Sequence, residues 1–357
     1  MISSGSSATL RARMLNLGVK RIEDALSVFE ALSLRDRKPE APIIIVHRNK
    51  GKSVSLGCFQ IADEDFAISY LRKKNFDYFF RLHGGDVMLH DENQVGIGII
   101  APNDEKYKEM HASLMSLLLK RNGIRSFQVT NDYIICFNKI LGEVTYLEKE
   151  SLLGWFTVLY LKRSYEEIAG LKFPKEQLIK ERVSKLKESC IGLDQVLGKQ
   201  VSAGQVFEMV KEVLSDELNF RLSAFRLGLA DKKYLWKSRE MLRKNSISER
   251  TRLNYLQLKH SAIPGETFLF SKRLMNGFLR VWVRIKDRNV ERVSISGSFM
   301  FEPPGKLRDF EKMLEGSPLE ETSLTEKITE FFINEKIKAS FTPFDIVELL
   351  CKAPGGK

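Results

Sequence analysis

Short runs of β-branched and aromatic residues follow one another between residues 41 and 161, and they limit the folds open to this chain. Polar links that contain Gly, Asn or Asp separate the runs, which favours antiparallel neighbours over long crossovers. The runs predicted as strands are 41–50, 54–60, 77–82, 86–90, 95–101, 127–129, 132–137, 139–145 and 154–161. Amphipathic runs at 8–35, 62–76 and 104–120 predict helices beside them. The sequence therefore predicts an α+β fold with a mixed, mostly antiparallel sheet flanked by helices.

The sequence pattern changes twice after residue 165. Residues 166–259 are rich in charged helical segments, and helices are predicted at 174–189, 203–215 and 231–245. Residues 261–265 (SAIPG) break this pattern, and three strand runs follow, separated by a hairpin signal at Asn276-Gly277 and by residues 287–289. The last helices are predicted at 306–314, 324–333 and 343–351. We expect two domains, residues 1–260 and a small α+β domain at 261–357, which suits a chain of 357 residues.

Charge and composition restrict the partners and the compartment. The net charge of +11 suits an anionic partner, although a basic surface that only aids solubility explains it equally well. No uninterrupted apolar run reaches about 18 residues, so no membrane span is expected. The first residues do not resemble a secretory signal, and the four cysteines form neither a zinc motif nor a disulfide framework. A cytoplasmic protein with reduced thiols is expected.

The stretch 79–100 (FFRLHGGDVMLHDENQVGIGII) carries the first candidate for chemistry. Arg81 precedes the pair Gly84-Gly85 within it. Paired glycines let the backbone approach a ligand closely, because no Cβ intervenes. The fork of an arginine side chain suits a carboxylate or a phosphate. This stretch is therefore a candidate anion-binding loop.

A second stretch, 130–144 (TNDYIICFNKILGEV), adds Asp132 before a strand and Lys139 after a tight turn. Two cations, a glycine-rich loop and a carboxylate suit the activation of a carboxylic acid by a nucleotide. Simpler explanations stay open: Lys139 fits an ordinary turn lysine, and Asp132 fits an Asx turn. His90 fits a core histidine. The chain has neither a GxxxxGK[ST] P-loop nor a GxSxG motif, which argues against P-loop NTPases and serine hydrolases.

These motifs together resemble the lipoate–protein ligase family, which has the biotin/lipoate ligase fold. Residues 81–91 (RLHGGDVMLHD) are similar, without gaps, to the family element Arg-x-Ser-Gly-Gly-Gly-Ala-Val-Tyr-His-Asp. Residues 131–133 and 138–142 are similar to the Asn-Asp-Ile and Lys-Lys-Ile/Val-x-Gly elements at the same spacing, and 57–60 (GCFQ) to an upstream Gly-x-x-Gln. The last ninety or so residues resemble the family's accessory C-terminal domain. The likeness thus covers most of the chain.

The resemblance implies an ATP-dependent lipoate–protein ligase. Lipoate and ATP would give lipoyl-AMP and pyrophosphate, and the lipoyl group would pass to a lysine of an acceptor. Lys139 inherits the catalytic role, Asp132 a place near the ribose or a Mg²⁺ ion, and Arg81 a place beside the phosphates. The residues implied to bind ATP and lipoyl-AMP are Arg81, Gly84, Gly85, Asp86, Val87, Met88, Leu89, Asp132 and Lys139. The implied partner is an acidic lipoyl-acceptor protein, such as the E2 of a 2-oxoacid dehydrogenase or the glycine cleavage H protein. Neither nucleic acid nor a membrane is expected to be a partner.

Several positions differ from the family pattern, and three of them bear most on the site. Asp86 stands in place of the third loop glycine, Glu143 in place of a small residue, and Trp155 on a strand where the family has histidine. Such changes could reshape the acyl site. Two alternatives therefore stay open. One is an ATP-independent octanoyl or lipoyl transferase with a cysteine nucleophile, and the other is a non-catalytic member that binds lipoylated partners.

Overall fold

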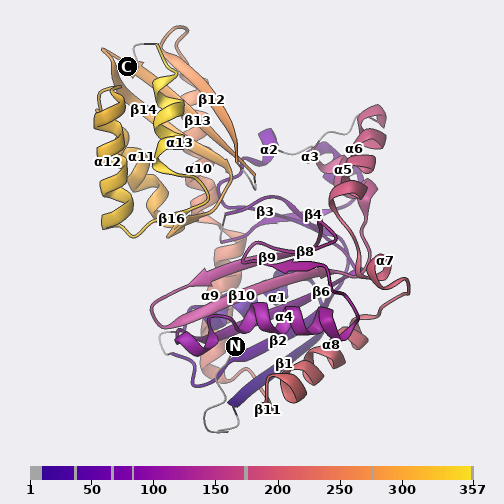
Figure 1. Ribbon diagram of the computed structural model, residues 1–357. Coiled ribbons are helices and arrows are strands. Elements are labelled where there is room, and N and C mark those ends of the chain that lie inside the picture. Colours follow the sequence, from indigo (N-terminus) through magenta and orange to yellow (C-terminus); the bar gives the residue numbers. More distant parts are fainter. Residues whose placement is uncertain are drawn as a thin grey trace. The chain divides into compact units, whose positions relative to one another are not determined.

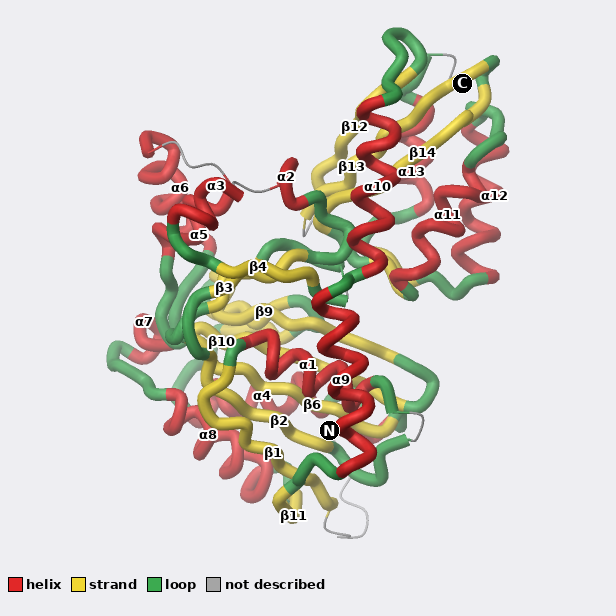
Figure 2. Tube along the Cα trace, turned by 180° about the vertical axis from the view of Figure 1, so that it is seen from behind, coloured by secondary structure: helices red, strands yellow, loops and turns green. Residues whose placement is uncertain are grey.

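The computed structural model describes residues 10–35, 38–65, 68–82, 84–172, 176–274 and 277–354. These residues form two compact units, and Figures 1 and 2 show their elements from opposite sides. The first unit contains the described residues up to Ser53 together with His90–Arg239, and the second contains Val54–Leu89 together with Glu240 onwards. The division expected at residue 260 concerns function, with a catalytic domain before it and an accessory domain after it. That division stays a prediction. As a compact body, however, segment 54–89 belongs with the C-terminal residues.

The first unit is built on a mixed sheet of eight described strands in the order β11-β1-β2-β6-β10-β9-β8-β7. β1 runs parallel to β2 and to β11, and each other neighbouring pair is antiparallel. The predicted α+β class with a mostly antiparallel sheet is confirmed. The strands are β1 (Leu10–Lys20), β2 (Ile43–Asn49), β6 (Gln94–Pro102), β7 (Phe127–Val129), β8 (Tyr133–Cys136), β9 (Lys139–Glu148), β10 (Leu152–Tyr160) and β11 (Phe220–Ala224).

Helices cover both faces of this sheet, as Figures 1 and 2 show. α4 and α8 enclose the larger apolar core, in which Ile44 and Ile97 of the sheet meet Leu114 of α4 and Val206 of α8. On the opposite face, Phe29 of α1 packs edge-on against a ring of β10. The helices of this unit are α1 (Ile22–Ser33), α4 (Met110–Arg121), α5 (Tyr165–Lys172), α6 (Glu176–Ser189), α7 (Leu193–Leu197), α8 (Ala203–Glu212), the short turns η1 (Glu105–Tyr107) and η2 (Val213–Glu217), and most of α9 (Leu229–Arg243).

Residues 10–20 correct the prediction of one helix at 8–35, since they form β1 and only α1 follows the prediction. Leu10 and Met14 recur at helical spacing, but Leu10, Ala12 and Met14 also alternate as in a strand. Two neighbouring strands, β2 and β11, offer backbone partners on both sides of this segment. That non-local pairing decides in favour of the strand. β11 itself was not predicted from the sequence.

The second unit contains an antiparallel sheet, β12-β13-β14, between helices. Apolar residues of β13 meet Phe310 of α11 and Ile346 of α13 on one face. On the other face the ring edge of Tyr255 from α10 contacts Trp282, with 6.1 Å between ring centres. The elements are β3 (Ser53–Leu56), α2 (Ala62–Asp65), α3 (Ile68–Lys73), β4 (Asp77–Phe80), β5 (Met88–His90), α10 (Ser246–His260), β12 (Thr267–Leu274), β13 (Gly277–Lys286), β14 (Asn289–Ser298), β15 (Phe301–Glu302), η3 (Pro304–Lys306), α11 (Leu307–Leu314), α12 (Glu321–Asn334), β16 (Lys338–Ala339) and α13 (Pro343–Cys351).

The predicted hairpin after residue 274 is present as a pair of strands, because Leu274 lies opposite Gly277 in the antiparallel β12–β13 ladder. Asn276, the other half of that signal, lies outside the described residues. Within the described ranges, none of the helices is both long enough and apolar enough to span a bilayer.

Candidate functional site

The glycine loop (residues 81–89) belongs to the second unit, and its glycines are required by close packing. A Cβ on Gly84 would lie 1.9 Å from the carbonyl oxygen of Phe299, just beyond β14. The N–H of Gly85 donates to the same oxygen at 2.8 Å. Gly85 also has a φ of +100°, which side chains disfavour. The Gly84-Gly85 pair therefore fixes the loop against the end of β14.

Arg81 holds the loop from inside. Its side chain is buried, and one terminal nitrogen donates to the carbonyl and the hydroxyl of Ser55 at 3.1 and 2.7 Å. The other donates to the carbonyl of Gly84 at 3.4 Å and to that of Asp86 at 2.5 Å. The carbonyl of Arg81 in turn accepts from the side-chain amide of Asn245 at 2.6 Å. The guanidinium thus joins the loop to Ser55 of β3.

Asp86, the negative residue of the loop, is also satisfied locally. Its carboxylate accepts from the N–H of Val87 at 2.7 Å and lies 3.5 Å from the amide nitrogen of Gln60. Val87 is half-buried, and Met88 and Leu89 are buried. The carboxylate therefore caps the loop backbone, and its charge is compatible with the folded loop.

Lys139 lies at the start of β9 in the first unit. The predicted tight turn precedes it, with Phe137 and Asn138 both at positive φ (50° and 61°). The residue is half-buried, and its ammonium donates to the carbonyl oxygen of Lys187, near the end of α6, at 2.7 Å. An ammonium carries three N–H groups, so this bond leaves donors for a ligand.

Asp132 lies at the surface, before β8. The turn is closed by the hydroxyl of Thr130, which accepts from the N–H groups of Asp132 and Tyr133 at 3.2 and 2.9 Å. The Asx-turn alternative is therefore wrong, and no described residue donates to the carboxylate. Desolvation by nearby atoms raises the pKa of this carboxyl even though the residue is exposed. Asp132 remains available for a ligand.

Glu143 forms part of a buried polar network that sequence reasoning missed. Its carboxylate accepts from the hydroxyl of Tyr160 and from the guanidinium of Arg163, the latter at 3.3 Å. The guanidinium carbon of Arg163 lies 3.3 Å from the centre of the Tyr160 ring. Burial raises the pKa of Tyr160 well above its usual value, so the phenol stays a donor. The negative charge of Glu143, which departs from the family pattern, is thus compensated by the positive charge of Arg163.

Trp155 is a core residue. Its ring is 2% exposed and stacks on His111 of α4 with 5.9 Å between ring centres. Burial lowers the pKa of His111 to about 4, and the neutral ring bonds the hydroxyl of Thr157 at 2.8 Å. The indole N–H donates to the side-chain oxygen of Asn131 at 3.1 Å. Trp155 thus supports the residue that precedes Asp132.

Cys58 and Cys136, the thiols considered as nucleophiles, are both buried. Burial raises the pKa of Cys136 to about 11 and that of Cys58 well above its usual value. Because the thiolate is the attacking species, neither environment activates a nucleophile.

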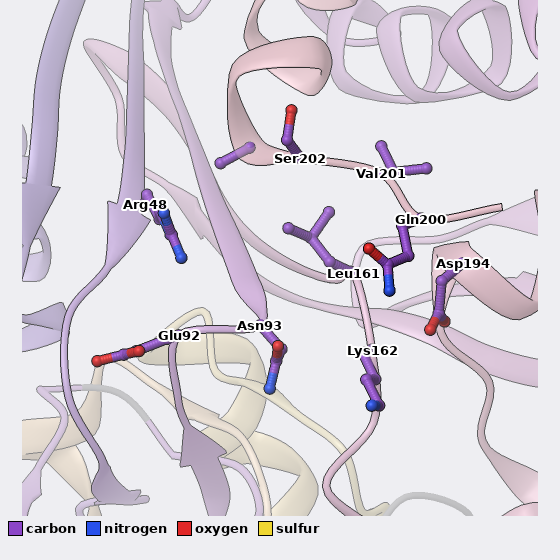
Figure 3. Close-up of a pocket in the computed structure, with 10 residues that line it drawn as sticks. Arg48, Glu92, Asn93, Leu161, Lys162, Asp194, Gln200, Val201 and Ser202 are labelled. Carbon is purple, nitrogen blue, oxygen red and sulfur yellow. The ribbon is translucent and has the colours of Figure 1, made fainter.

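The first unit also contains a cavity of about 300 Å³ that none of these residues lines. Figure 3 shows it between Arg48, Glu92, Lys162 and Asp194, with Ser202 on one side. Two cations and two acids surround it, so it has no clear charge preference. None of the predicted site residues lines it.

The predicted residues therefore fall into two groups. The glycine loop lies in the second unit, whereas Asp132 and Lys139 lie in the first. In the loop, the N–H groups of Gly85 and Val87 already have acceptors, whereas the ammonium of Lys139 keeps donors for a ligand. That the two groups form one site stays a prediction. Among the described residues, no three metal-ligating side chains cluster, so a Mg²⁺ ion would need phosphate oxygens beside Asp132.

Comparison with known families gives two matches. A model of the lipoyl protein ligase A/B catalytic domain matches residues 22–215, and a model of the bacterial lipoate protein ligase C-terminus matches residues 264–350. Among curated proteins, the octanoyltransferase LipM of Moorella thermoacetica is 21% identical over 227 residues, which cover 56% of this chain and 83% of that protein.

Solved structures share the fold. LipL1 of P. falciparum in complex with lipoate covers 94% of this chain and 98% of its own, with a TM-score of 0.66 and 12% identity. A bipartite lipoate protein ligase of Thermoplasma acidophilum, studied with its E2 lipoyl domain, covers 66% and 93% with a TM-score of 0.57 and 17% identity. A lipoate-protein ligase A bound with ATP covers 66% and 95% with a TM-score of 0.54 and 17% identity.

Proposed function

This chain belongs to the lipoyl protein ligase A/B family, and we propose that it is an ATP-dependent lipoate–protein ligase. The observation that carries the proposal is the ammonium of Lys139, which donates one N–H to a backbone carbonyl and has others left for a ligand. The match of residues 264–350 to a ligase C-terminal domain supports the ATP-dependent reaction over simple acyl transfer. The structural relatives with bound ATP and bound lipoate support the same two substrates.

In the first step, a carboxylate oxygen of lipoate attacks the α-phosphorus of ATP, and pyrophosphate leaves. Lys139 would neutralise the acyl carboxylate and the α-phosphate, and the negative charge of both reactants makes that cation necessary. The glycine loop, Gly84 to Leu89, would lie beside the phosphates, with Arg81 keeping the loop in shape. Asp132 would hold a Mg²⁺ ion together with phosphate oxygens, and that ion would add positive charge there.

In the second step, the amine of an acceptor lysine attacks the acyl carbonyl of lipoyl-AMP, and AMP leaves. We infer that the acceptor is a lipoyl domain, as in the E2 lipoyl domain studied with the Thermoplasma ligase. The net charge of +11 would speed encounter with an acidic domain. A cytoplasmic location is part of the proposal.

The test is a reaction of the purified protein with ATP, Mg²⁺, lipoate and an apo lipoyl domain, read by intact mass. The proposal predicts a lipoyl mass increase on the acceptor and release of AMP and pyrophosphate. Omission of ATP is the control. Absence of the increase with lipoate and with octanoate, across several acceptor domains, would contradict the proposal.

The second candidate is ATP-independent transfer from an octanoyl or lipoyl carrier, which the likeness to the Moorella octanoyltransferase favours. It needs a thiolate, and burial opposes one at Cys58 and at Cys136. Transfer from octanoyl-carrier protein without ATP, lost in a Cys58→Ala, Cys136→Ala double variant, would establish it. A non-catalytic binder would instead bind lipoyl-AMP without ever producing a modified acceptor.

A further inference from the structure

The C-terminal end of α6 is attached to the strand that carries Lys139. The carbonyl of Lys187 accepts from the ammonium of Lys139 at 2.7 Å. Three residues further on, Cys190 pairs with Ile140 as an isolated parallel bridge. The N–H of Ile191 donates to the carbonyl of Ile140 at 2.9 Å. We call residues 187–191 the lysine support.

Side chains of the same unit hold the lysine support in place. The hydroxyl of Tyr165 donates to the carbonyl of Cys190 at 3.1 Å. The guanidinium of Arg163 lies 3.6 Å from the sulfur of Cys190 while it also bonds Glu143 of β9 at 3.3 Å. Arg163 is buried, so these contacts are shielded from water. The lysine support and β9 are therefore tied together at the backbone and at the side chains.

The chemistry of a helix end suits this contact. The last carbonyls of a helix have no partner within it, and they carry the negative end of the helix dipole. A carbonyl at that end favours a cation, and it fixes where the nitrogen of Lys139 lies. Only one of the three N–H groups of the ammonium is used, so the others can face a carboxylate and a phosphate at the same time.

We propose that the lysine support positions Lys139 for formation of the acyl-adenylate, with Lys187 acting through its main-chain carbonyl and Tyr165 as a positioning residue. The inference rests on the proposed function, because it assumes that Lys139 contacts the adenylate. If the contact only capped α6, its loss would weaken α6 and leave ligand binding through Lys139 unchanged. The two roles can be separated by a double-mutant cycle.

The cycle combines Ile191→Pro with Lys139→Ala. Proline removes the N–H that bonds Ile140, and Ile191→Ala, which keeps that N–H, is the matched control. The ligand is lipoyl-sulfamoyl-adenosine, an unreactive analogue of lipoyl-AMP, and its Kd is measured by calorimetry. We expect Ile191→Pro to weaken binding about 10-fold, since small misplacements of a contacting group are costly. In the Lys139→Ala background, Ile191→Pro should weaken binding of the analogue no more than about 2-fold, because the effects of coupled residues are not additive.

Equal losses in both backgrounds would overturn the inference, as would equal affinities of Ile191→Pro and Ile191→Ala. If Ile191→Pro does not fold by circular dichroism, Tyr165→Phe takes its place in the cycle, with an expected loss of about 3-fold in the Lys139 background and none beside Lys139→Ala. Failure of the proposed function looks different, because the protein without substitutions would then make no lipoyl-AMP from lipoate and ATP, whatever its affinity for the analogue.

Discussion

Arg81 and Lys139, the two cations assigned to the site, differ in what they already contact. Arg81 is buried and donates to Ser55 and to the carbonyls of its own loop. Lys139 is half-buried and donates to one carbonyl at the end of a helix. Burying a charge is costly unless hydrogen bonds satisfy it, so Arg81 is coupled to the fold. Lys139 makes one such hydrogen bond, so it is less strongly coupled to the fold.

This contrast assigns different tasks to the two parts of the proposed site. The loop of the second unit supplies shape, and the arginine, the glycines and Asp86 are all used to hold that shape. The hairpin of the first unit supplies charge that is still available, at Lys139 and Asp132. Substitutions in the loop should therefore lower stability and activity together, whereas substitutions at Lys139 should lower activity alone.

The largest effect is expected for Lys139→Ala. Loss of a cation that stabilises developing charge should reduce adenylate formation by about 10²- to 10³-fold. Thermal unfolding should change little, because the side chain is half-buried and makes one bond. Pyrophosphate exchange measures the first step, and Lys187→Ala is the control because the accepting carbonyl stays in place. If Lys139→Ala lowered thermal stability as well as activity, Lys139 would be a structural cation like Arg81, and the contrast between the two would not hold.

Gly84→Ala should be the most damaging change to the loop. A Cβ there would lie 1.9 Å from a backbone oxygen, so the loop or the end of β14 must shift. Overpacking of this kind costs about 1–3 kcal/mol, and the upper end is expected against backbone. The control is Gly305→Ala in the same unit, where a Cβ meets nothing within 4 Å. Urea unfolding measures both, and equal midpoints would show that Gly84 is not needed for packing.

Arg81→Lys tests whether shape or charge matters in the loop. A lysine keeps the charge but cannot span the acceptors that the planar fork reaches. We expect a loss of about 2 kcal/mol in unfolding free energy, within the range for buried charged hydrogen bonds, and a parallel loss of activity. Arg72→Lys, at an exposed position of the same unit, should change neither. Full stability with lost activity would instead assign Arg81 directly to the ligand.

Much of this could be predicted from the sequence because the signals are local. The strands at 41–50, 95–101 and 154–161 each contain a largely apolar run, and the structure confirms them as β2, β6 and β10. The tight turn before Lys139 and the close packing of Gly84-Gly85 follow from residue types with special backbone preferences. The family motif made those positions stand out as a candidate site.

What the sequence did not reveal depends on pairing between distant residues. β1 has helical spacing, and only its neighbours β2 and β11 make it a strand. Glu143 looked like an obstacle because its partner Arg163 lies on another element, and no local pattern links them. The internal bonds of Arg81 are likewise invisible in a motif. Register and burial decide these cases, and both arise from the whole fold.

The two units should also respond to pH in opposite directions. Burial lowers the pKa values of His47 and His111 in the first unit to about 4 from 6.5, so between those pH values the unfolded chain binds more protons. Stability of the first unit then rises with pH across this window and is lost as pH falls through it. In the second unit, burial raises the pKa of Glu311 to about 7 from 4.5, so the folded state holds the proton and stability is lost as pH rises.

Each group contributes a slope of at most about 1.4 kcal/mol per pH unit, so between pH 5 and pH 6 the expected effect is about 1 kcal/mol per group. Amide exchange, corrected for its intrinsic pH dependence, can follow peptides of β6 and β14 separately. Protection should rise with pH in β6 and fall in β14. Glu311→Gln should abolish the fall in β14 and leave β6 unchanged, because Ile295 and Asn254, which donate to this carboxylate, lie in the second unit. Parallel trends in both peptides would mean that the donors around Glu311, including Arg308 at 3.0 Å, keep it ionised despite its burial.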